Sequence, residues 1–411
     1  MEQIKVNKAK RLLIYACQNV PFYRNNYDFN PDEIKSLTIK EFNEYWKSIP
    51  LLSKSDVLNN IHYFLSDKLK DMKTHYDKTS GSTGTPLFLK VNTSCWTVRH
   101  ARDLQVKEWF GIRNGEKYAL FWGQHWSNKS KREIALKDFL LNRIRISAFN
   151  QEEKYLEESF KRIKKFKPTF IMGYPSAITD LCSFIKAKNC DLSFLKLKAV
   201  ITTAEPLRNY QRKIISEICN CGVFSQYGGA EQGFVACECE KGGFHIFSDT
   251  TWLEDENGEM KPNTLTEAIA TDLELYSMPL IRYRTGDEVI FKEGKCSCGR
   301  TYPLLERVEG RSGEDIILPN GKKINANLPS YIFKEIASMG VIRRYRFVDK
   351  KDGMLYLYII PTQKFNQEVL NLVEKETQNA FGKDIQLKIE ITNVLENMPN
   401  AKHKDYVVIN E

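Results

Sequence analysis

The sequence lacks the features that mark several large classes of protein. No apolar run approaches the roughly 18–20 residues that span a bilayer, so we expect no membrane span. The 10 cysteines among 411 residues are too few for a disulfide scaffold and are clustered, which favours metal binding or chance. The apolar run Leu12–Cys17 is too short for a signal peptide, and no small-residue cleavage site follows it. These absences predict a soluble, cytoplasmic protein.

An excess of charge of one sign is also missing. Lys and Arg total 61 against 52 Asp and Glu, a net charge of +9, and 42% of the residues are hydrophobic, as in ordinary globular proteins. No basic stripe with interleaved aromatic residues is present, and the densest basic run, Lys161–Lys167, is most simply a solvated helix face. We therefore expect no nucleic acid partner, whereas the mild positive field suits an anionic small ligand.

The first half of the chain predicts an α/β fold. Residues 1–75 are expected to be mostly helical, and Thr38 with Glu41 three residues later fits a capping box. Strands and helices alternate over residues 75–230. This alternation is typical of a wound α/β sheet.

The second half of the chain has a different pattern. Short strands predominate over residues 245–310, with strands expected at 280–283 and 288–291, and this segment predicts a β-rich subdomain. Residues 311–411 predict a separate small α/β unit. Within that unit, Asp352-Gly353 is expected to form a hairpin turn.

The strongest chemical motif is TSGSTGTP at Thr79–Pro86. Its glycines allow positive φ and a close approach of the backbone to a ligand, and successive backbone N–H groups can cradle phosphate oxygens. The motif is not the lysine-containing phosphate loop, because GxxxxGK[ST] is absent, and it lacks the GxSxG spacing of a nucleophile elbow. An ordinary polar loop is the alternative.

Four further segments carry possible chemistry. Gln226–Gly233 combines a tyrosine, a glycine turn and an acid, which suits an aromatic face beside a base and a carboxylate beside a metal. Tyr283–Asp287 places an acid after a Thr-Gly turn, expected at a strand end, where it can bind a ribose diol. Glu309–Ile317 offers an arginine and glycines, and Met398–Lys404 offers a terminal lysine. Taken singly, simple turns and a solvated basic tail are the alternatives.

The order of these segments resembles the adenylate-forming acyl-ligase superfamily. TSGSTGTP, ITTAEPL, QYGGAEQG, YRTGD, EGRSGEDI and a terminal lysine loop follow one another along the chain. With NVPFYRNNY, IPLLSKSDV and MGYPSAIT, the chain is similar to the phenylacetate–coenzyme A ligase family, especially its capsular polysaccharide and coenzyme F390 synthetase-like branch. The resemblance implies a nucleotide- and acyl-binding domain over 1–309, with wound α/β sheets plus the β-rich subdomain, and a small mobile α+β domain over 310–411.

The resemblance also implies an activity. A carboxylate attacks the α-phosphorus of ATP, pyrophosphate leaves, and the resulting acyl-adenylate passes its acyl group to coenzyme A with release of AMP. Such chemistry needs alignment and charge stabilisation by Mg²⁺, backbone donors and a lysine. Two alternatives stay open: transfer to an amine in surface polysaccharide or natural-product assembly, and a catalytically quiet nucleotide-binding scaffold. The carboxylic acid is left open, and family habit suggests a homodimer.

Nucleotide binding is assigned by resemblance to three segments. The β- and γ-phosphates are assigned to the loop residues Ser80, Gly81, Ser82, Thr83, Gly84 and Thr85. The adenine pocket is assigned to Ala204, Glu205 and Pro206. Tyr227, with Gly228 beside it, is assigned to the adenine or the reacting carboxylate.

The remaining roles concern ribose, magnesium and catalysis. Asp287 is assigned to the ribose hydroxyls, and Arg311 to the ribose or a phosphate. Glu231 is assigned to Mg²⁺. Catalysis is expected to depend on Lys404, Glu231 and Thr83. The terminal loop departs from the family pattern because it lacks the glycine before the lysine, so Lys402 is kept as the alternative to Lys404.

The acyl pocket is expected to be walled by aromatic residues. Trp122, Gly123, Tyr174 and Pro175 are the candidates, by resemblance and by aromatic character. Core packing is the alternative, because buried aromatic residues are common without a ligand.

Five residues predict a zinc site. Cys237-x-Cys239 is followed by His245 and then by Cys296-x-Cys298, and Zn²⁺ takes thiolate and imidazole ligands in tetrahedral sets. Some members of the resembled family carry a structural zinc here, and their register favours Cys239 over Cys237. The predicted ligands are Cys239, His245, Cys296 and Cys298. The alternative is free cysteines with a surface histidine.

Overall fold

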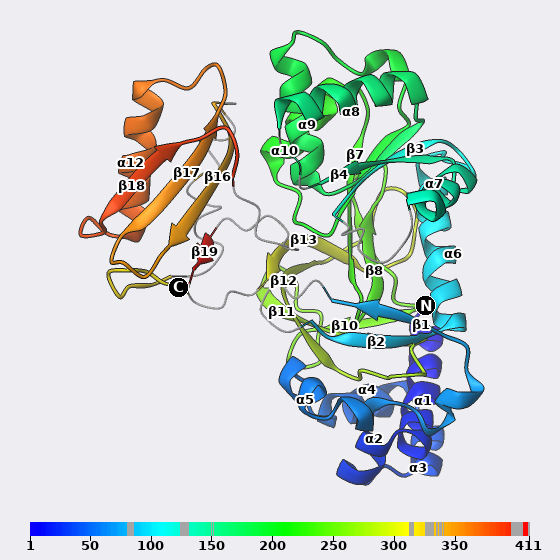
Figure 1. Cartoon of the computed structure of the whole chain (residues 1–411). Coiled ribbons are helices and arrows are strands. Elements are labelled where there is room, and N and C mark those ends of the chain that lie inside the picture. The colour runs from blue at the N-terminus through cyan, green and yellow to red at the C-terminus, as the bar shows by residue number, and fades with distance from the viewer. Residues whose placement is uncertain are drawn as a thin grey trace. The chain divides into compact units, whose positions relative to one another are not determined.

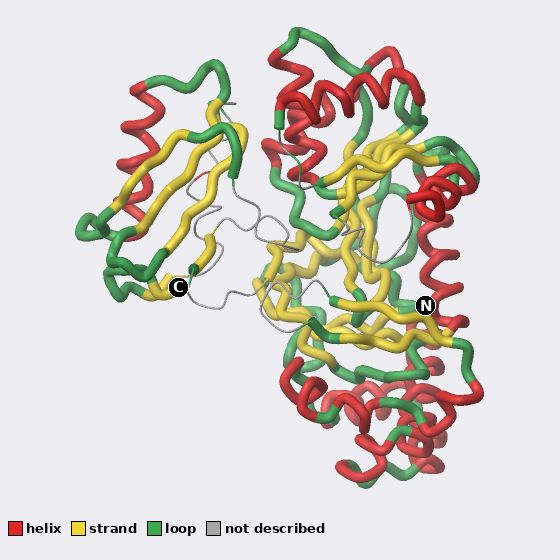
Figure 2. The backbone as a smooth tube through the Cα atoms, viewed as in Figure 1, coloured by secondary structure: helices red, strands yellow, loops and turns green. Residues whose placement is uncertain are grey.

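The structure is a computed structural model, and it describes residues 1–79, 86–123, 131–148, 150, 152–311, 316–324, 333, 336, 339, 341–395 and 406–409. The chain divides into two compact units. Unit 1 combines Met1–Asn114 with Phe224–Gly310, and unit 2 combines Gly115–Val223 with Arg311–Glu411. Both mix helices and strands (Figures 1 and 2), so the predicted α/β class is confirmed. The boundary predicted between residues 309 and 310 stays a prediction.

Unit 1 begins with helices, as predicted. They are α1 (Glu2–Asn19), α2 (Pro21–Asn26), α3 (Pro31–Ser36), α4 (Ile39–Ser48) and α5 (Lys54–Asn59), followed by 3₁₀ turns at Ile61–Phe64 and Asp67–Asp71. The capping box predicted at Thr38 is confirmed, because its side chain accepts the N–H of Glu41 while Glu41 accepts the N–H of Thr38. Reciprocal bonds of this kind satisfy donors that a helix start leaves without partners.

The strands of unit 1 form a mostly antiparallel sheet. In the order β10-β11-β12-β13-β9-β8-β7, they are β10 (Thr251–Glu254), β11 (Leu265–Asp272), β12 (Tyr283–Lys292), β13 (Leu304–Arg311), β9 (Phe244–Ile246), β8 (Gly233–Glu238) and β7 (Val223–Gly229). A separate hairpin of β1 (Thr74–Lys78) and β2 (Phe88–Asn92) leads into the long helix α6 (Thr93–Trp109).

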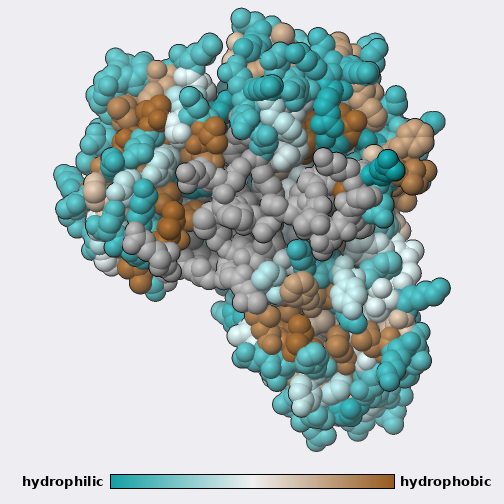
Figure 3. Space-filling view, viewed as in Figure 1, coloured by the Kyte–Doolittle hydropathy of each residue, from teal (hydrophilic) through white to brown (hydrophobic). Residues whose placement is uncertain are grey.

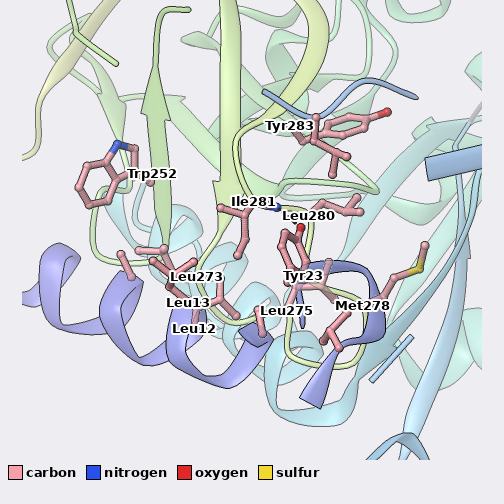
Figure 4. Close-up of a cluster of buried hydrophobic side chains, with 14 of the residues drawn as sticks. Leu12, Leu13, Tyr23, Trp252, Leu273, Leu275, Met278, Leu280, Ile281 and Tyr283 are labelled. Atoms are coloured by element: carbon pink, nitrogen blue, oxygen red, sulfur yellow. Dashed lines mark hydrogen bonds between the residues drawn. The ribbon is translucent and has the colours of Figure 1, made fainter. Parts of the chain in front are cut away.

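The N-terminal helices pack against the loop between β11 and β12 (Figure 4). Leu12 and Leu13 of α1 are fully buried there. Tyr23 of α2 is buried as well, and its hydroxyl donates to the carbonyl of Pro279 and accepts the N–H of Ile281, both at 3.0 Å. Because a buried hydroxyl without partners is costly, these two bonds fix the loop to the helices.

The strand predicted at residues 280–283 is wrong. The structure has one strand, Tyr283–Lys292, which includes the strand predicted at 288–291. Leu280 and Ile281 are buried, but their side chains belong to the core of Figure 4, and Arg282 turns the backbone to a positive φ of 52°. Apolar residues in this segment therefore signalled a buried loop rather than a strand.

The first part of unit 2 is a parallel sheet with helices, as predicted from the alternating pattern. Its strands follow the order β6-β5-β3-β4, with β6 (Ala199–Thr203), β5 (Phe170–Gly173), β3 (Tyr118–Trp122) and β4 (Arg143–Ser147). The helices are α7 (Lys131–Leu140), α8 (Glu153–Phe166), α9 (Pro175–Ala187) and α10 (Asn209–Cys219), with a 3₁₀ turn at Ser193–Leu195. α9 packs between α8 and α10 over a shared apolar core.

The rest of unit 2 contains a second sheet. A short hairpin of β14 (Ile316–Ile317) and β15 (Lys323–Ile324) precedes a sheet of order β18-β17-β16-β19. Its elements are β16 (Ile342–Asp349), β17 (Leu355–Pro361), α12 (Gln367–Phe381), β18 (Leu387–Ile391) and β19 (Tyr406–Val408). The predicted turn at Asp352-Gly353 joins β16 and β17, with Gly353 at a φ of 85°. The mobility of this part stays a prediction.

Within the described residues, no helix is long and apolar enough to span a membrane. Hydrophilic residues cover most of the described surface in the view of Figure 3, with apolar patches between them.

Candidate active site and metal centre

The proposed phosphate loop, residues 80–85, lies outside the described residues, so the roles assigned to Ser80, Gly81, Ser82, Thr83, Gly84 and Thr85 stay predictions. The flanks of the loop are described. The Thr79 N–H donates to the carbonyl of Leu87 at 3.0 Å, and the Leu87 N–H donates to the Thr79 hydroxyl at 2.9 Å. Both residues are buried, so this pair fixes the two points between which the loop runs.

The segment Gln226–Gly233 forms a tight hairpin between β7 and β8. Gly229 pairs with Gly233 across the hairpin, and residues 230–232 make the turn. Gly233 has a φ of 68°, and a Cβ there would lie 2.7 Å from both Arg99 Nε and Asp272 Oδ2. Only glycine fits both the backbone conformation and the space. The predicted glycine turn is therefore confirmed, and Glu231 lies in it.

Among the residues predicted to bind the nucleotide, Tyr227 and Asp287 are joined directly by a hydrogen bond. The Tyr227 hydroxyl donates to Asp287 Oδ2 at 3.1 Å, from β7 to β12. Burial, the Asp287 charge and, to a smaller extent, the Glu231 charge raise the pKa of Tyr227 well above its usual range. The tyrosine therefore stays a neutral hydrogen-bond donor at physiological pH.

Asp287 lies within a strand rather than at its end, where it was expected. Thr285, Gly286 and Asp287 belong to the middle of β12, opposite a register shift between Glu267 and Ile269 of β11. The Asp287 N–H donates to Thr285 Oγ1 at 3.1 Å, and that hydroxyl donates to the carbonyl of Ala268 at 2.8 Å. A bulge of this kind changes the direction of side chains within a sheet. The orientation of Asp287 therefore depends on a bulge rather than on the predicted turn.

The predicted acyl-pocket residues lie together in unit 2, where β3 and β5 end. The rings of Trp122 and Tyr174 are 4.9 Å apart, and Gly123 directly follows Trp122. Gly173 has a φ of 146°, and a Cβ there would clash with the carbonyl of Phe121. Glycine at position 173 allows the backbone to pass close to Phe121 before it enters Tyr174 and Pro175, where α9 begins.

The predicted adenine-pocket residues follow β6 in the same unit. Ala204 has a φ of 71°, a strained conformation for a residue with a Cβ, and such strain clusters at ligand sites. Glu205 Oε2 accepts the N–H of Ser176 at 3.2 Å, near the start of α9, where a helix favours negative charge. Burial and the Glu205 charge raise the pKa of Tyr174 to about 12.

Glu205 and Pro206 line a cavity of about 120 Å³, together with Ser176, Asp180 and Arg208. Glu205 Oε1 is buried and has no hydrogen-bond partner among the described residues. A buried carboxylate oxygen in this state offers an acceptor to a ligand donor.

The predicted nucleotide and acyl residues are divided between the two units. Tyr227, Gly228, Glu231 and Asp287 belong to unit 1, whereas Trp122, Gly123, Tyr174, Ala204, Glu205 and Pro206 belong to unit 2. Arg311 ends β13, and its side chain is not described. Lys402 and Lys404 lie outside the described residues. The convergence of these groups on one ligand stays a prediction.

The four predicted metal ligands do lie together. The ligand atoms of Cys239, His245, Cys296 and Cys298 are within 4.8 Å of one another. The sulfurs of Cys239 and Cys296 are 3.6 Å apart, and Cys298 Sγ is 3.2 Å from His245 Nε2. Around Zn²⁺, tetrahedral geometry with bonds of about 2.0–2.3 Å gives ligand separations of about 3.3–3.8 Å. The 3.6 Å separation of the two sulfurs lies in this range and the 3.2 Å separation of sulfur and nitrogen lies just below it, so the set of three cysteines and one histidine suits a structural zinc.

Backbone groups prepare the sulfurs for a metal. The Lys241 N–H points to Cys239 Sγ at 3.4 Å, and the Arg300 N–H points to Cys298 Sγ at 3.5 Å. Although burial raises the pKa of the Cys298 thiol, hydrogen bonds from the backbone and side chain of Arg300 bring it below its usual value. Burial, and then the Arg300 charge, lower the pKa of His245. These shifts favour the thiolate at Cys298 and the neutral imidazole at His245 that bind metal, whereas burial raises the pKa of Cys239 to about 11.

The side chains of Arg300, Trp109 and Glu240 lie beside the cluster. Cys237 is not part of the cluster. The Arg300 guanidinium lies 4.2 Å from the Trp109 ring centre and pairs with both Glu240 oxygens at 3.0 Å. Trp109 meets the His245 ring edge-on at 5.7 Å. Cys237 packs instead with Val106 and Phe247, and burial raises its pKa.

Sequence reasoning did not single out Arg99 and Asp272. Both contact the turn that carries Glu231, and Asp272 ends β11. A partly buried arginine on a helix has no local pattern that reveals its partner, whereas an acid at the end of a strand is a recognisable signal.

Comparison with known proteins gives a likeness along almost the whole chain. No protein-family model matches it. Protein CapK of Staphylococcus aureus is 24% identical over 395 residues, which cover 95% of this chain and 85% of CapK. A phenylacetate-coenzyme A ligase of Pseudomonas putida is 24% identical over 368 residues, which cover 84% of this chain and 79% of the ligase.

A comparison with solved structures shows that the likeness extends to the fold. The crystal structure of 2-hydroxyisobutyryl-CoA ligase in the postadenylation state aligns with a TM-score of 0.76 at 17% identity, covering 98% of this chain and 89% of the ligase. The chain thus has the fold of an adenylate-forming acyl-CoA ligase, and in sequence it resembles phenylacetate-coenzyme A ligases and CapK.

Proposed function

We propose that this protein activates a carboxylic acid with ATP, forming an acyl-adenylate and pyrophosphate, and then transfers the acyl group to coenzyme A with release of AMP. One observation carries the proposal. The sequence likeness to a phenylacetate-coenzyme A ligase covers 84% of the chain, and it is accompanied by the ordered motifs from the phosphate loop to the YRTGD segment. A likeness of this extent supports the whole reaction rather than nucleotide binding alone.

The described geometry supports particular roles in unit 1. Asp287 is held by Tyr227 and by its own neighbour Thr285, so its carboxylate has a fixed direction for the ribose hydroxyls. Glu231 lies in a turn whose backbone is constrained, and carboxylates are the ligands that Mg²⁺ prefers. Bound Mg²⁺ supplies charge compensation on the phosphates. The protein residues bind and align the reactants, which is most of what nucleotidyl transfer requires.

Unit 2 supports the acyl and adenine roles. Trp122 and Tyr174 offer aromatic walls, and the buried Glu205 oxygen offers an acceptor near Pro206. Lys404, with Lys402 as the alternative, is proposed to stabilise the negative charge that develops as the carboxylate attacks.

We further propose that Cys239, His245, Cys296 and Cys298 hold one structural Zn²⁺. Four protein ligands leave no open position, so the metal would contribute stability to the β8–β9 region rather than chemistry. Elemental analysis of the purified protein is expected to give about one zinc per chain.

The experiment that tests the function measures AMP release from ATP with a panel of carboxylic acids. We expect release that requires an acid and is accelerated by coenzyme A. Release that is accelerated only by an amine would replace coenzyme A with an amine acceptor and favour an amide ligase. ATP binding without any acid-dependent AMP or pyrophosphate release would overturn the proposal and favour a nucleotide-binding scaffold.

A further inference from the structure

A partly buried arginine contacts the turn that carries Glu231. Arg99 lies on α6, and its side chain is 14% exposed. Its Nε and Nη2 donate to Asp272 Oδ2 at 3.1 Å and 2.9 Å, and Nη2 also donates to the carbonyl of Ala230 at 3.1 Å. Ala230 is the residue directly before Glu231, so this bond holds the peptide unit from which the predicted magnesium ligand extends.

The other end of the same turn rests on the same ion pair. A Cβ on Gly233 would lie 2.7 Å from Arg99 Nε and 2.7 Å from Asp272 Oδ2, so the Gly233 backbone is packed directly against both side chains. The turn at residues 230–232 therefore has a hydrogen bond to Arg99 at its start and a van der Waals contact with the Arg99–Asp272 pair at its end.

The pair itself is well fixed. Asp272 is 5% exposed, and its Oδ1 accepts the N–H of Glu274 at 2.9 Å while Cys95 Sγ lies 3.5 Å from Oδ2. A buried ion pair whose remaining acceptors are satisfied has one favoured geometry, because any rotation leaves a buried charge without a partner. Arg99 and Asp272 thus form a rigid support under the turn.

Arg99 also faces the hairpin that leads into the phosphate loop. Its Nη1 lies 3.8 Å from Asp77 Oδ2, and Asp77 is on β1, two residues before Thr79. One guanidinium therefore contacts both the strand that enters the loop at residues 80–85 and the turn that carries Glu231.

We propose that Arg99 is a positioning residue for the magnesium–ATP site, holding Glu231 and strand β1 in a fixed relation. The inference rests on the proposed function, because it takes Glu231 as the magnesium ligand. Groups that orient a metal ligand commonly change metal affinity by about 10–100-fold when they are removed. Arg99 acts through Glu231 and does not itself touch the nucleotide.

The test compares two arginines of α6 that form ion pairs, Arg99 and Arg102. Arg99→Met removes the support, and Arg102→Met is the matched control, because Arg102 pairs with Asp249 at 2.6 Å and lies over the Phe247 ring instead. ATP binding is measured by calorimetry without any acid, over a range of Mg²⁺ concentrations. We expect the half-saturating Mg²⁺ concentration to rise about 10-fold in Arg99→Met and less than about 2-fold in Arg102→Met.

A second variant tests whether Arg99 acts through Glu231. In a Glu231→Gln background, Arg99→Met is expected to cause no further change in the Mg²⁺ dependence. Wild-type Mg²⁺ dependence in Arg99→Met, an equal shift in Arg102→Met, or an undiminished effect in the Glu231→Gln background would each overturn the inference. If Arg99→Met does not fold, Arg99→Lys, which keeps the charge but not both hydrogen-bonding directions, is read by the same criteria.

The failure of this inference and the failure of the proposed function are distinguishable. Wild-type protein that binds magnesium–ATP but never releases AMP with any acid would overturn the function, and the Arg99 comparison would still be readable in binding. Acid-dependent AMP release by the wild type, with unchanged Mg²⁺ dependence in Arg99→Met, would overturn only the role of Arg99.

Discussion

The candidate metal cluster and the proposed nucleotide site of unit 1 are built in different ways. Two of the four predicted metal ligands, Cys296 and Cys298, are two positions apart, while Cys239 directly follows β8 and His245 lies in β9. The nucleotide residues come from strands and turns far apart in the sequence, such as Tyr227 and Asp287, which are 60 positions apart. Each half of the cluster is therefore held by a short loop, and the sheet joins the two halves, since Cys239 and Cys296 are 57 positions apart. The nucleotide residues depend on the sheet throughout.

This difference predicts a division of labour. The cluster is closed by its own side chains and backbone N–H groups, so its loss should reduce stability more than chemistry. The Tyr227, Glu231 and Asp287 group is proposed to bind the nucleotide and its Mg²⁺, so its loss should reduce chemistry more than stability. The predictions below test whether that separation holds.

The largest effect is expected for Glu231→Gln. Removing the charge that supports the magnesium-bound phosphates should slow acid-dependent ATP–pyrophosphate exchange on the order of 10²–10³-fold. Glu256→Gln is the control, because Glu256 is exposed and lies 3.7 Å from Arg284 in the same unit. An exchange rate within about 2-fold of wild type in Glu231→Gln would remove Glu231 from the reaction.

Cys296→Ser tests the other side of the comparison. The variant is expected to lose zinc and about 3 kcal/mol of stability, because the binding free energy of a structural metal is part of the folding free energy. Cys237→Ala is the matched control, since Cys237 is a near neighbour that packs outside the cluster. Denaturant unfolding and elemental analysis provide the measurements. Full zinc content in Cys296→Ser would contradict the ligand assignment.

Gly233→Ala tests whether the turn is constrained by packing as well as by φ. We expect a loss of about 2 kcal/mol, because the new methyl group meets the Arg99–Asp272 pair in addition to the backbone strain. Gly115→Ala has similar strain at a φ of 84° but nothing within 4 Å, so about 1 kcal/mol is expected. Equal losses in the two variants, measured by denaturant unfolding, would show that packing against Gly233 contributes nothing.

The smallest effect is expected for Tyr227→Phe. Losing one hydrogen bond to Asp287 should weaken ATP binding by about 5-fold, equivalent to about 1 kcal/mol. Calorimetry measures the affinity, and the stability is expected to change little because the ring itself is retained. An unchanged affinity of Tyr227→Phe for ATP would contradict the proposal that the Tyr227–Asp287 hydrogen bond contributes to nucleotide binding.

The sequence predicted best where a feature depends on near neighbours. The capping box at Thr38, the glycine turn at 226–233 and the hairpin turn at Asp352-Gly353 all follow from local rules, and the structure contains them. Cys239, His245, Cys296 and Cys298 also lie together as expected. The ligands within each half are close in sequence, and the family resemblance indicated that the two halves meet.

Features set by distant packing were missed. The segment 280–283 looked like a strand, but Ile281 bonds to Tyr23, about 260 positions away, and the strand begins only at Tyr283. Arg99 contacts Asp272 and Ala230 only because the tertiary fold brings them together, and no spacing in the sequence predicts these contacts. Binding of one ligand by residues of both units would likewise be set by tertiary packing rather than by local sequence patterns.

The most direct test of the account follows the oxygen atoms of the substrate. An acid whose carboxylate carries heavy oxygen is incubated with ATP, coenzyme A and the protein, and the products are analysed by mass spectrometry. Attack of the carboxylate on the α-phosphorus predicts one labelled oxygen in AMP and none in pyrophosphate. Label in inorganic phosphate, or AMP formed without label while the acyl product accumulates, would contradict the adenylate mechanism.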